Sequence, residues 1–146
     1  MRRVILVVDD DPAVLRSYGH LFRRLGCQVV LANDSERVLA DPDSLRGVDL
    51  LILDQRMPRT CGLDLLATLR RRETGREAQP GAGGDAQAGA AVTHPAVILI
   101  SAFLSAEIKQ RAARLGVMEI IEKPVDIAHL LASVRVALEN RPPRRP

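Results

Sequence analysis

The chain contains 146 residues, of which 47% are hydrophobic and 27% are charged, and its formal net charge at pH 7 is +3. This length and balance are typical of one globular domain that can bury a sizeable core. Aromatic residues make up only 2% of the chain, which argues against single-strand nucleic-acid binding by base stacking.

The sequence resembles neither a membrane protein nor an exported, disulfide-bonded one. No apolar run reaches the roughly 18 to 20 residues that a membrane helix needs. The short apolar stretch 4–8 runs into three aspartates, unlike a secretory signal. Cys27 and Cys61 are too few for a disulfide framework and lack metal-site spacing, so we expect free thiols. We therefore expect a cytoplasmic protein that makes no contact with a membrane.

Two strands and two helices are predicted at the start of the chain. Residues 3–8 form a buried apolar run, and residues 28–32 form a short β-branched one. Between them, apolar residues recur at helical spacing from Asp11, which suits a helix N-cap, to Gly26, which suits a helix C-terminus. A brief helix is expected around 36–40.

The run 48–54 is the most informative of the predicted strands. Five of the six residues before Asp54 are apolar, which is typical of a strand buried on both faces of a parallel sheet. Gly62 opens the next predicted helix, and the charged residues 70–73 form its exposed end. From residue 74 to about 93, Gly, Ala, Gln and Pro dominate without apolar periodicity, so we expect a flexible loop there.

The rest of the chain is predicted to add two strands, two helices and a tail. These are a strand at 96–100, a helix from the Ser105 cap to 115, a strand at 117–121, a helix capped by Asp126, and an Arg- and Pro-rich tail at 141–146. Strands that alternate with helices in this way predict an α/β fold, a doubly wound five-stranded parallel sheet with helices on both faces.

Polar and charged residues follow four of the five predicted strands. Asp9 and Asp10 follow the first strand, Asp54 ends the third, Ser101 closes the fourth, and Lys123 follows the fifth. The carboxyl ends of parallel strands lie on one edge of a sheet, and ligands bind at that edge. We therefore expect these five side chains to converge although they are far apart in the sequence.

This set of side chains favours phosphoryl-transfer chemistry. Two like charges about 4 Å apart repel by roughly 1 kcal/mol in water and by about 4 kcal/mol at an effective dielectric constant of 20. A divalent cation removes that cost, and ligands that are all oxygen favour Mg²⁺, Mn²⁺ or Ca²⁺. Lys123 supplies positive charge for a phosphoryl group and Ser101 a hydrogen-bond donor. Asp54 is then predicted to be a carboxylate nucleophile that forms an aspartyl phosphate.

Several residues at or beside this sheet edge also have a simpler interpretation when each is taken alone. Asp54 would merely end a strand, Asp11 would only cap a helix, Ser101 would form a turn, and Lys123 would be a solvated lysine. The presence of five complementary groups at one sheet edge favours the functional interpretation.

At these motifs the chain resembles the receiver domain of two-component response regulators, in its CheY-like, single-domain form. The matching pieces are VVDD at 7–10, LDQRMP at 53–58 with Gly62, ISA at 100–102, and the pair Lys123-Pro124. The resemblance covers about residues 3–139 and implies a flavodoxin-like, receiver-type fold.

The resemblance implies a metal site as well as a phosphoacceptor. Asp54 corresponds to the phosphoacceptor and would also bind the metal. Asp10 would bind Mg²⁺ (or Mn²⁺) directly, Asp9 would bind it through water, and the Arg56 backbone carbonyl would complete the protein ligands.

The resemblance also implies how the phosphoryl group is held. Ser101 and the Ala102 backbone would contact it, and Lys123 would pair with it. The Lys123–Pro124 peptide bond is expected to be cis, which suits a tight turn.

The chain departs from the family pattern in two places. Ile120 stands where the family often has an aromatic switch residue, and the link before the fourth strand is longer than usual. We expect a receiver domain at 1–140 with a loop insertion at 74–95, a tail at 141–146, and no output domain after Asn140.

The expected function is a phosphorylation-controlled switch that catalyses only its own phosphorylation and dephosphorylation. A sensor histidine kinase or phosphotransfer protein would supply the phosphoryl group, and a downstream partner would read it. A homodimer through the fourth helix, fifth strand and fifth helix is a further expectation, and the basic residues of that fourth helix (Lys109, Arg111, Arg114) suit an acidic partner. The alternative is a phosphorylation-independent, receiver-like interaction module. A DNA-binding regulator ranks last, because no recognition helix is predicted.

Overall fold

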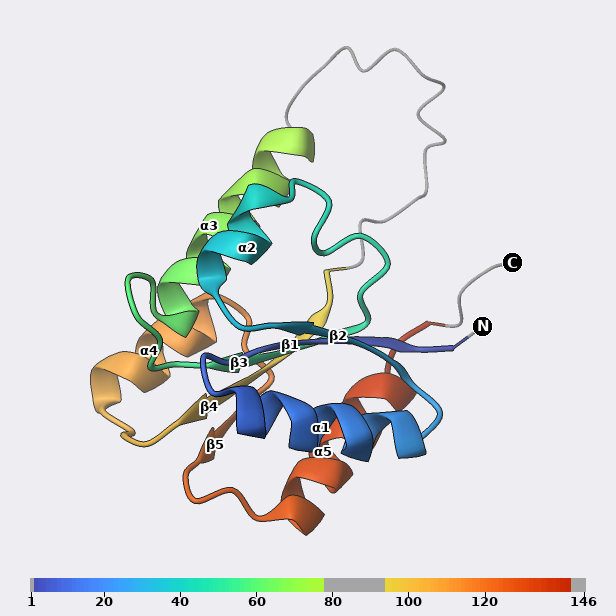
Figure 1. The fold of residues 1–146 in the computed structure, drawn as a ribbon. Coiled ribbons are helices and arrows are strands. Elements are labelled where there is room, and N and C mark those ends of the chain that lie inside the picture. Colours follow the sequence, from blue (N-terminus) through green and yellow to red (C-terminus); the bar gives the residue numbers. More distant parts are fainter. Residues whose placement is uncertain (1, 78–93, 143–146) are drawn as a thin grey trace, which may run out of the picture.

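The computed structural model describes residues 2–77 and 94–142 (Figure 1). Five strands form one parallel sheet in the order β2-β1-β3-β4-β5. The elements are β1 Val4–Val8, α1 Pro12–Arg24, β2 Gln28–Ala32, α2 Ser35–Ala40, β3 Leu50–Asp54, α3 Gly62–Glu77, β4 Ala96–Ser101, α4 Ala106–Arg114, β5 Glu119–Glu122 and α5 Ile127–Glu139. The predicted doubly wound fold is confirmed.

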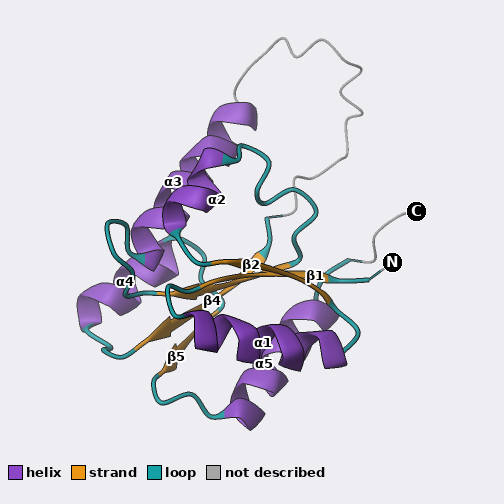
Figure 2. Ribbon diagram, viewed as in Figure 1, coloured by secondary structure: helices purple, strands orange, loops and turns teal. Residues whose placement is uncertain are grey.

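Helices cover both faces of the sheet, with α1 and α5 on one side and α2, α3 and α4 on the other (Figures 1 and 2). Each strand contributes side chains to the core on both faces of the sheet, because successive side chains of a strand point to opposite faces. On β3, Leu50 and Ile52 pack with α1 and α5, whereas Leu51 and Leu53 pack with the opposite layer. Every residue of β3 is buried, as its nearly continuous apolar sequence predicts.

Helix α1 illustrates how local sequence places an element. Asp11 accepts a hydrogen bond from the Ala13 backbone N–H at 2.9 Å and so caps the helix, as predicted. Tyr18 and Phe22 are buried against the sheet, with their ring centroids 5.7 Å apart. Gly26 follows the helix with φ of 82°, a left-handed conformation that glycine adopts without strain.

The boundaries of α3 and of the loop after it correct the sequence-based prediction. Residues 74–77 were expected in a flexible loop, but α3 continues through them to Glu77. The Thr74 hydroxyl donates to the Arg70 carbonyl at 2.9 Å, so this polar turn is held by its own helix. The rest of the predicted loop, residues 78–93, lies outside the described residues.

Near the C-terminus two further details differ from the prediction. β5 begins at Glu119 rather than at 117, because Val117 N–H bonds back to the Ala112 carbonyl in the turn after α4. Arg141, assigned to the tail, is held against the domain because its carbonyl accepts a hydrogen bond from Arg3 at 3.0 Å.

Two findings bear on the expected class of protein. Across the described ranges 2–77 and 94–142, every helix is too short or too polar to cross a bilayer. Cys27 and Cys61 are both free thiols, the first buried and the second half-buried.

Gly62 allows α3 to start directly against the end of β3. A Cβ atom at this position would lie 2.5 Å from the Asp54 carbonyl oxygen and 3.2 Å from the Gln55 Cα atom. The Gly62 N–H donates to the Gln55 carbonyl at 3.0 Å, and the Gln55 side chain accepts from Leu63 N–H at 2.9 Å. The first turn of α3 is thus hydrogen-bonded to Gln55, the residue that directly follows β3.

We predict that Gly62→Ala lowers the free energy of unfolding by about 1–3 kcal/mol, because backbone atoms must move to admit the methyl group. Gly75→Ala in the same helix is the matched control, since a Cβ there meets nothing within 4 Å. That control should stabilise the protein by up to about 1 kcal/mol, because alanine loses less backbone entropy than glycine on folding. Urea denaturation measures both changes, and equal effects of the two variants would contradict the packing described.

Candidate functional site

The five side chains that the sequence singles out all lie at the carboxyl edge of the sheet. Asp9 and Asp10 follow β1, Asp54 is the last residue of β3, and Ser101 is the last residue of β4. Lys123 follows β5, and its backbone N–H donates to the Ser101 carbonyl at 2.9 Å. The predicted convergence is therefore present.

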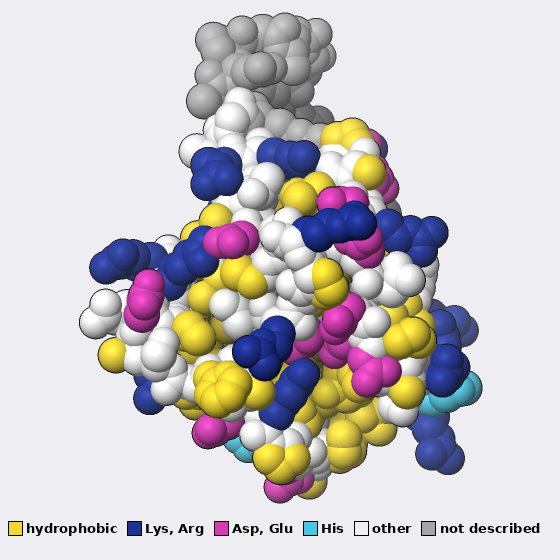
Figure 3. All heavy atoms as spheres, turned by 60° about the vertical axis from the view of Figure 1, so that its left-hand side comes forward, with side chains coloured by type: hydrophobic (Ala, Val, Ile, Leu, Met, Phe, Trp, Pro, Cys, Tyr) yellow, Lys and Arg dark blue, Asp and Glu magenta, His cyan; other side chains and the backbone are white. Residues whose placement is uncertain are grey.

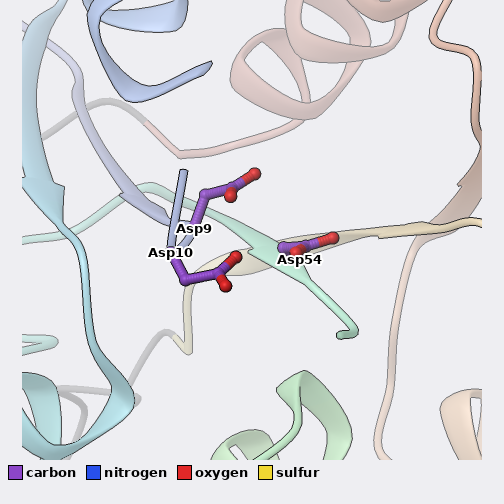
Figure 4. Close-up of side chains that lie close together, drawn as sticks. All are labelled: Asp9, Asp10 and Asp54. Atoms are coloured by element: carbon purple, nitrogen blue, oxygen red, sulfur yellow. The ribbon is translucent and has the colours of Figure 1, made fainter. Parts of the chain in front are cut away.

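Asp9, Asp10 and Asp54 form a compact acidic cluster. Each offers a carboxylate oxygen, and these three oxygens lie within 4.8 Å of one another. In Figure 4 the side chains of Asp9 and Asp10, at the end of β1, lie beside the end of β3, where Asp54 is located. Asp9 and Asp54 are each only 4% exposed, whereas Asp10 faces solvent.

Burial makes negative charge costly in this cluster. It raises the pKa of Asp9 to about 6, and the neighbouring Asp54 and Asp10 carboxylates add to the increase, although the Asp11 N–H opposes it. Burial also raises the pKa of Asp54, against the opposing effect of Lys123. The site therefore gains stability from any added positive charge.

Lys123 supplies part of that positive charge. Its ammonium lies 2.9 Å from Asp54 Oδ1, and its side chain is 39% exposed. Burial disfavours the ammonium, but the hydrogen bond to Asp54 and the attraction of the three aspartates together raise the pKa of Lys123. The Lys123–Pro124 peptide bond is cis, as expected.

Ser101 is buried at the site, but its hydroxyl is engaged away from Asp54. It donates to the Phe103 carbonyl at 2.7 Å and accepts from the Phe103 N–H at 3.3 Å. Ala102, which lies between Ser101 and Phe103 in the chain, is exposed.

One contact at the site was not predicted from the sequence. The Arg56 guanidinium carbon lies 5.6 Å from the centroid of the Phe103 ring, which is the geometry of a cation–π interaction. Phe103 itself gave a signal, because it is one of two phenylalanines and directly follows the ISA motif. On the face of the molecule seen in Figure 3, acidic, basic and hydrophobic side chains lie next to one another.

The residues at this edge fit a divalent cation. All the side-chain donors in the cluster are carboxylate oxygens, which hard cations such as Mg²⁺ prefer. Two of the three carboxylates are buried, and their raised pKa values express a need for positive charge that Lys123 meets only in part. Asp9, Asp10 and Asp54 are therefore the residues that could hold the ion.

Comparisons with known proteins point to one family. Residues 5–79 match the family described as the response regulator receiver domain. The response regulator protein TmoT of Ectopseudomonas mendocina is 30% identical over 142 residues, which are 97% of this chain and 56% of TmoT. The chain thus spans little more than half the length of that relative.

Solved structures agree with the architecture. The crystal structure of a response regulator receiver protein from Pseudomonas putida has a TM-score of 0.73 at 26% identity, covering 93% of this chain and 98% of that one. The non-phosphorylated HemR receiver domain of Leptospira biflexa has a TM-score of 0.75 at 20% identity, covering 99% of this chain and 100% of that one.

We predict that, without divalent cations, the free energy of unfolding rises as the pH falls from 7 to 5. Native Asp9, with its pKa raised to about 6, binds a proton near pH 6, whereas in the unfolded chain its pKa is near the ordinary aspartate value of 3.8, so protonation favours the native state. The expected gain from Asp9 is about 1 kcal/mol over this range. Urea denaturation at several pH values measures it.

Asp9→Asn is the matched variant for this prediction, because it cannot titrate. Its stability should vary less with pH than that of the unmodified protein, and the difference between the two curves isolates Asp9 from other titrating groups. Parallel curves for the two proteins would contradict the assigned pKa.

Proposed function

The chain belongs to the family of response regulator receiver domains, and on this premise we propose that it is a signalling switch that accepts a phosphoryl group on Asp54. Membership of the family places it in phosphorylation-controlled two-component signalling. The observation that carries the proposal is the position of Asp54, a buried carboxylate at the carboxyl edge with Lys123 at 2.9 Å and two further aspartates beside it.

The proposed reaction transfers a phosphoryl group from a phosphohistidine of a kinase or phosphotransfer protein. An Asp54 carboxylate oxygen forms a bond to phosphorus while the phosphorus–nitrogen bond breaks. The electron pair of the broken bond stays on the nitrogen of the histidine ring. Lys123 helps to keep Asp54 ionised and then pairs with the phosphoryl oxygens. Ser101 and the Ala102 backbone would donate hydrogen bonds to the same oxygens.

A divalent cation, Mg²⁺ or Mn²⁺, fits the acidic cluster and would neutralise charge on the transferred group. Asp9, Asp10, Asp54 and the Arg56 backbone carbonyl are the groups that would hold it. The domain is not an enzyme in the usual sense, since in this proposal it acts only on its own Asp54 by phosphorylation and later hydrolysis.

We further propose that the receiver unit extends to Arg141, with the link between α3 and β4 as an insertion and the residues after Arg141 as a tail. Its expected partners are a sensor histidine kinase or phosphotransfer protein and a downstream protein. The proposed output and dimer surface is the face of α4, β5 and α5, which exposes Met118 at 41% and Val136 at 50%. Lys109 and Arg114 are exposed on α4, whereas Arg111 pairs with Asp64 at 2.5 Å and is less available to a partner.

The first prediction from this proposal is that acetyl phosphate phosphorylates the protein on Asp54 only when Mg²⁺ is present. Asp54→Asn keeps the shape of the side chain but removes the nucleophile, so it should take up no phosphate. Asp11→Asn is the control, because asparagine also caps a helix and Asp11 serves α1. Intact-protein mass spectrometry measures the bound phosphate. Full phosphorylation of Asp54→Asn would contradict the assignment of Asp54 as the phosphoacceptor.

The same measurement separates the main alternative. A phosphorylation-independent interaction module would take up no phosphate in either protein, with or without Mg²⁺.

The second prediction is that phosphorylation increases dimer formation through the face of α4, β5 and α5. Val136→Glu on α5 should abolish the phosphorylated dimer, because it places a charge on an exposed apolar position of that face. Val30→Glu is the matched control, since Val30 is 43% exposed on β2 at the opposite sheet edge. Sedimentation velocity measures the dimer, and equal loss in both variants would place the interface elsewhere.

A further inference from the structure

Two loops beside Asp54 are joined by the contact between Arg56 and Phe103, which we call the Arg56–Phe103 clasp. Arg56 lies between β3 and α3, and Phe103 lies between β4 and α4. Phe103 is 65% exposed, whereas Phe22, the other phenylalanine of the chain, is fully buried. The Phe103 ring is therefore outside the core, with the Arg56 guanidinium over one of its faces.

Each half of the clasp is connected to the phosphorylation site through its backbone. Arg56 is two residues after Asp54 in the loop that follows β3, and its backbone N–H lowers the pKa of the Asp54 carboxyl, against the effect of burial. On the other side, the Phe103 backbone makes two hydrogen bonds with the Ser101 hydroxyl, at 2.7 and 3.3 Å. The two residues of the clasp are thus tied to the two groups that a phosphoryl group would contact first.

Phosphorylation of Asp54 would act on both halves. The Ser101 hydroxyl has one hydrogen, which it gives to the Phe103 carbonyl, so it can donate to a phosphoryl oxygen only after that bond breaks. The phosphoryl group also adds negative charge to the residue two positions before Arg56. A guanidinium that turned to this group would exchange an exposed cation–π contact for a charge-assisted hydrogen bond, which is the stronger interaction.

We propose that the Arg56–Phe103 clasp is closed in the unphosphorylated protein and opens when Asp54 is phosphorylated, which frees the face of the exposed Phe103 ring that the guanidinium covers. This inference rests on the proposed function and adds to it a route by which the site signals outward. Ile120 provides no ring at the family's usual switch position, whereas Phe103 provides one that is directly coupled to Ser101. An uncovered aromatic ring is also the kind of side chain that anchors protein interfaces.

The composition of the chain allows a direct test by fluorine NMR. Incorporation of 4-fluorophenylalanine into the full chain gives two signals, one from Phe103 and one from Phe22 in the core. Phosphorylation with acetyl phosphate and Mg²⁺ should shift the Phe103 signal and leave the Phe22 signal in place. Mass spectrometry of the same sample records whether Asp54 carries phosphate.

Two variants of the unphosphorylated protein test the clasp itself. Arg56→Gln removes the cation, so it should move the Phe103 signal towards its phosphorylated position without any phosphate. Arg59→Gln is the matched control, because Arg59 lies in the same loop but pairs with Glu36 at 2.7 Å. It should leave the Phe103 signal unchanged.

The possible results separate this inference from the function on which it rests. Phosphate on Asp54 with an unmoved Phe103 signal would overturn the clasp alone, and so would an Arg56→Gln signal identical to that of the unmodified protein. Absence of phosphate would overturn the proposed function, and with it the control of the clasp by phosphorylation.

Discussion

The site depends on the electrostatic cost of placing three carboxylates at the end of a buried sheet. Parallel strands bury apolar side chains on both faces, and where they end, three carboxylates meet in an environment that disfavours charge. The Lys123 ammonium, 2.9 Å from Asp54, lowers this electrostatic cost only in part, as the raised pKa values of Asp9 and Asp54 indicate. The remaining need for positive charge makes the edge suitable for a cation, and the cation makes it suitable for a phosphoryl group.

Features with a local physical cause could be predicted from the sequence. The helix caps Asp11 and Asp126 accept hydrogen bonds from their own helices, so residue type and spacing were sufficient to find them. Each of the five strands and five helices was predicted, because apolar periodicity reflects burial on one or both faces. The meeting of Asp9, Asp54 and Lys123 then followed from topology, since parallel strands end on one edge.

Features that depend on where two distant loops lie could not be predicted in this way. The Arg56–Phe103 clasp joins residues in different loops, and neither residue type implies the other. Ser101 was identified as a site residue, but its bond to the Phe103 carbonyl depends on the path of the loop after β4. Likewise, the Asp64 contact that engages Arg111 depends on how α4 lies against α3.

The buried position of Tyr18 has an optical consequence. The chain has one tyrosine and no tryptophan, so its intrinsic ultraviolet emission comes from this ring. Tyr18 packs against Phe22, and burial raises its pKa, with a further increase from the charges on Asp9 and Asp54. Negative charge on Asp9 and Asp54 therefore raises the pH at which the Tyr18 phenol ionises, and because the chain has one tyrosine this ionisation can be followed by ultraviolet absorption without a label.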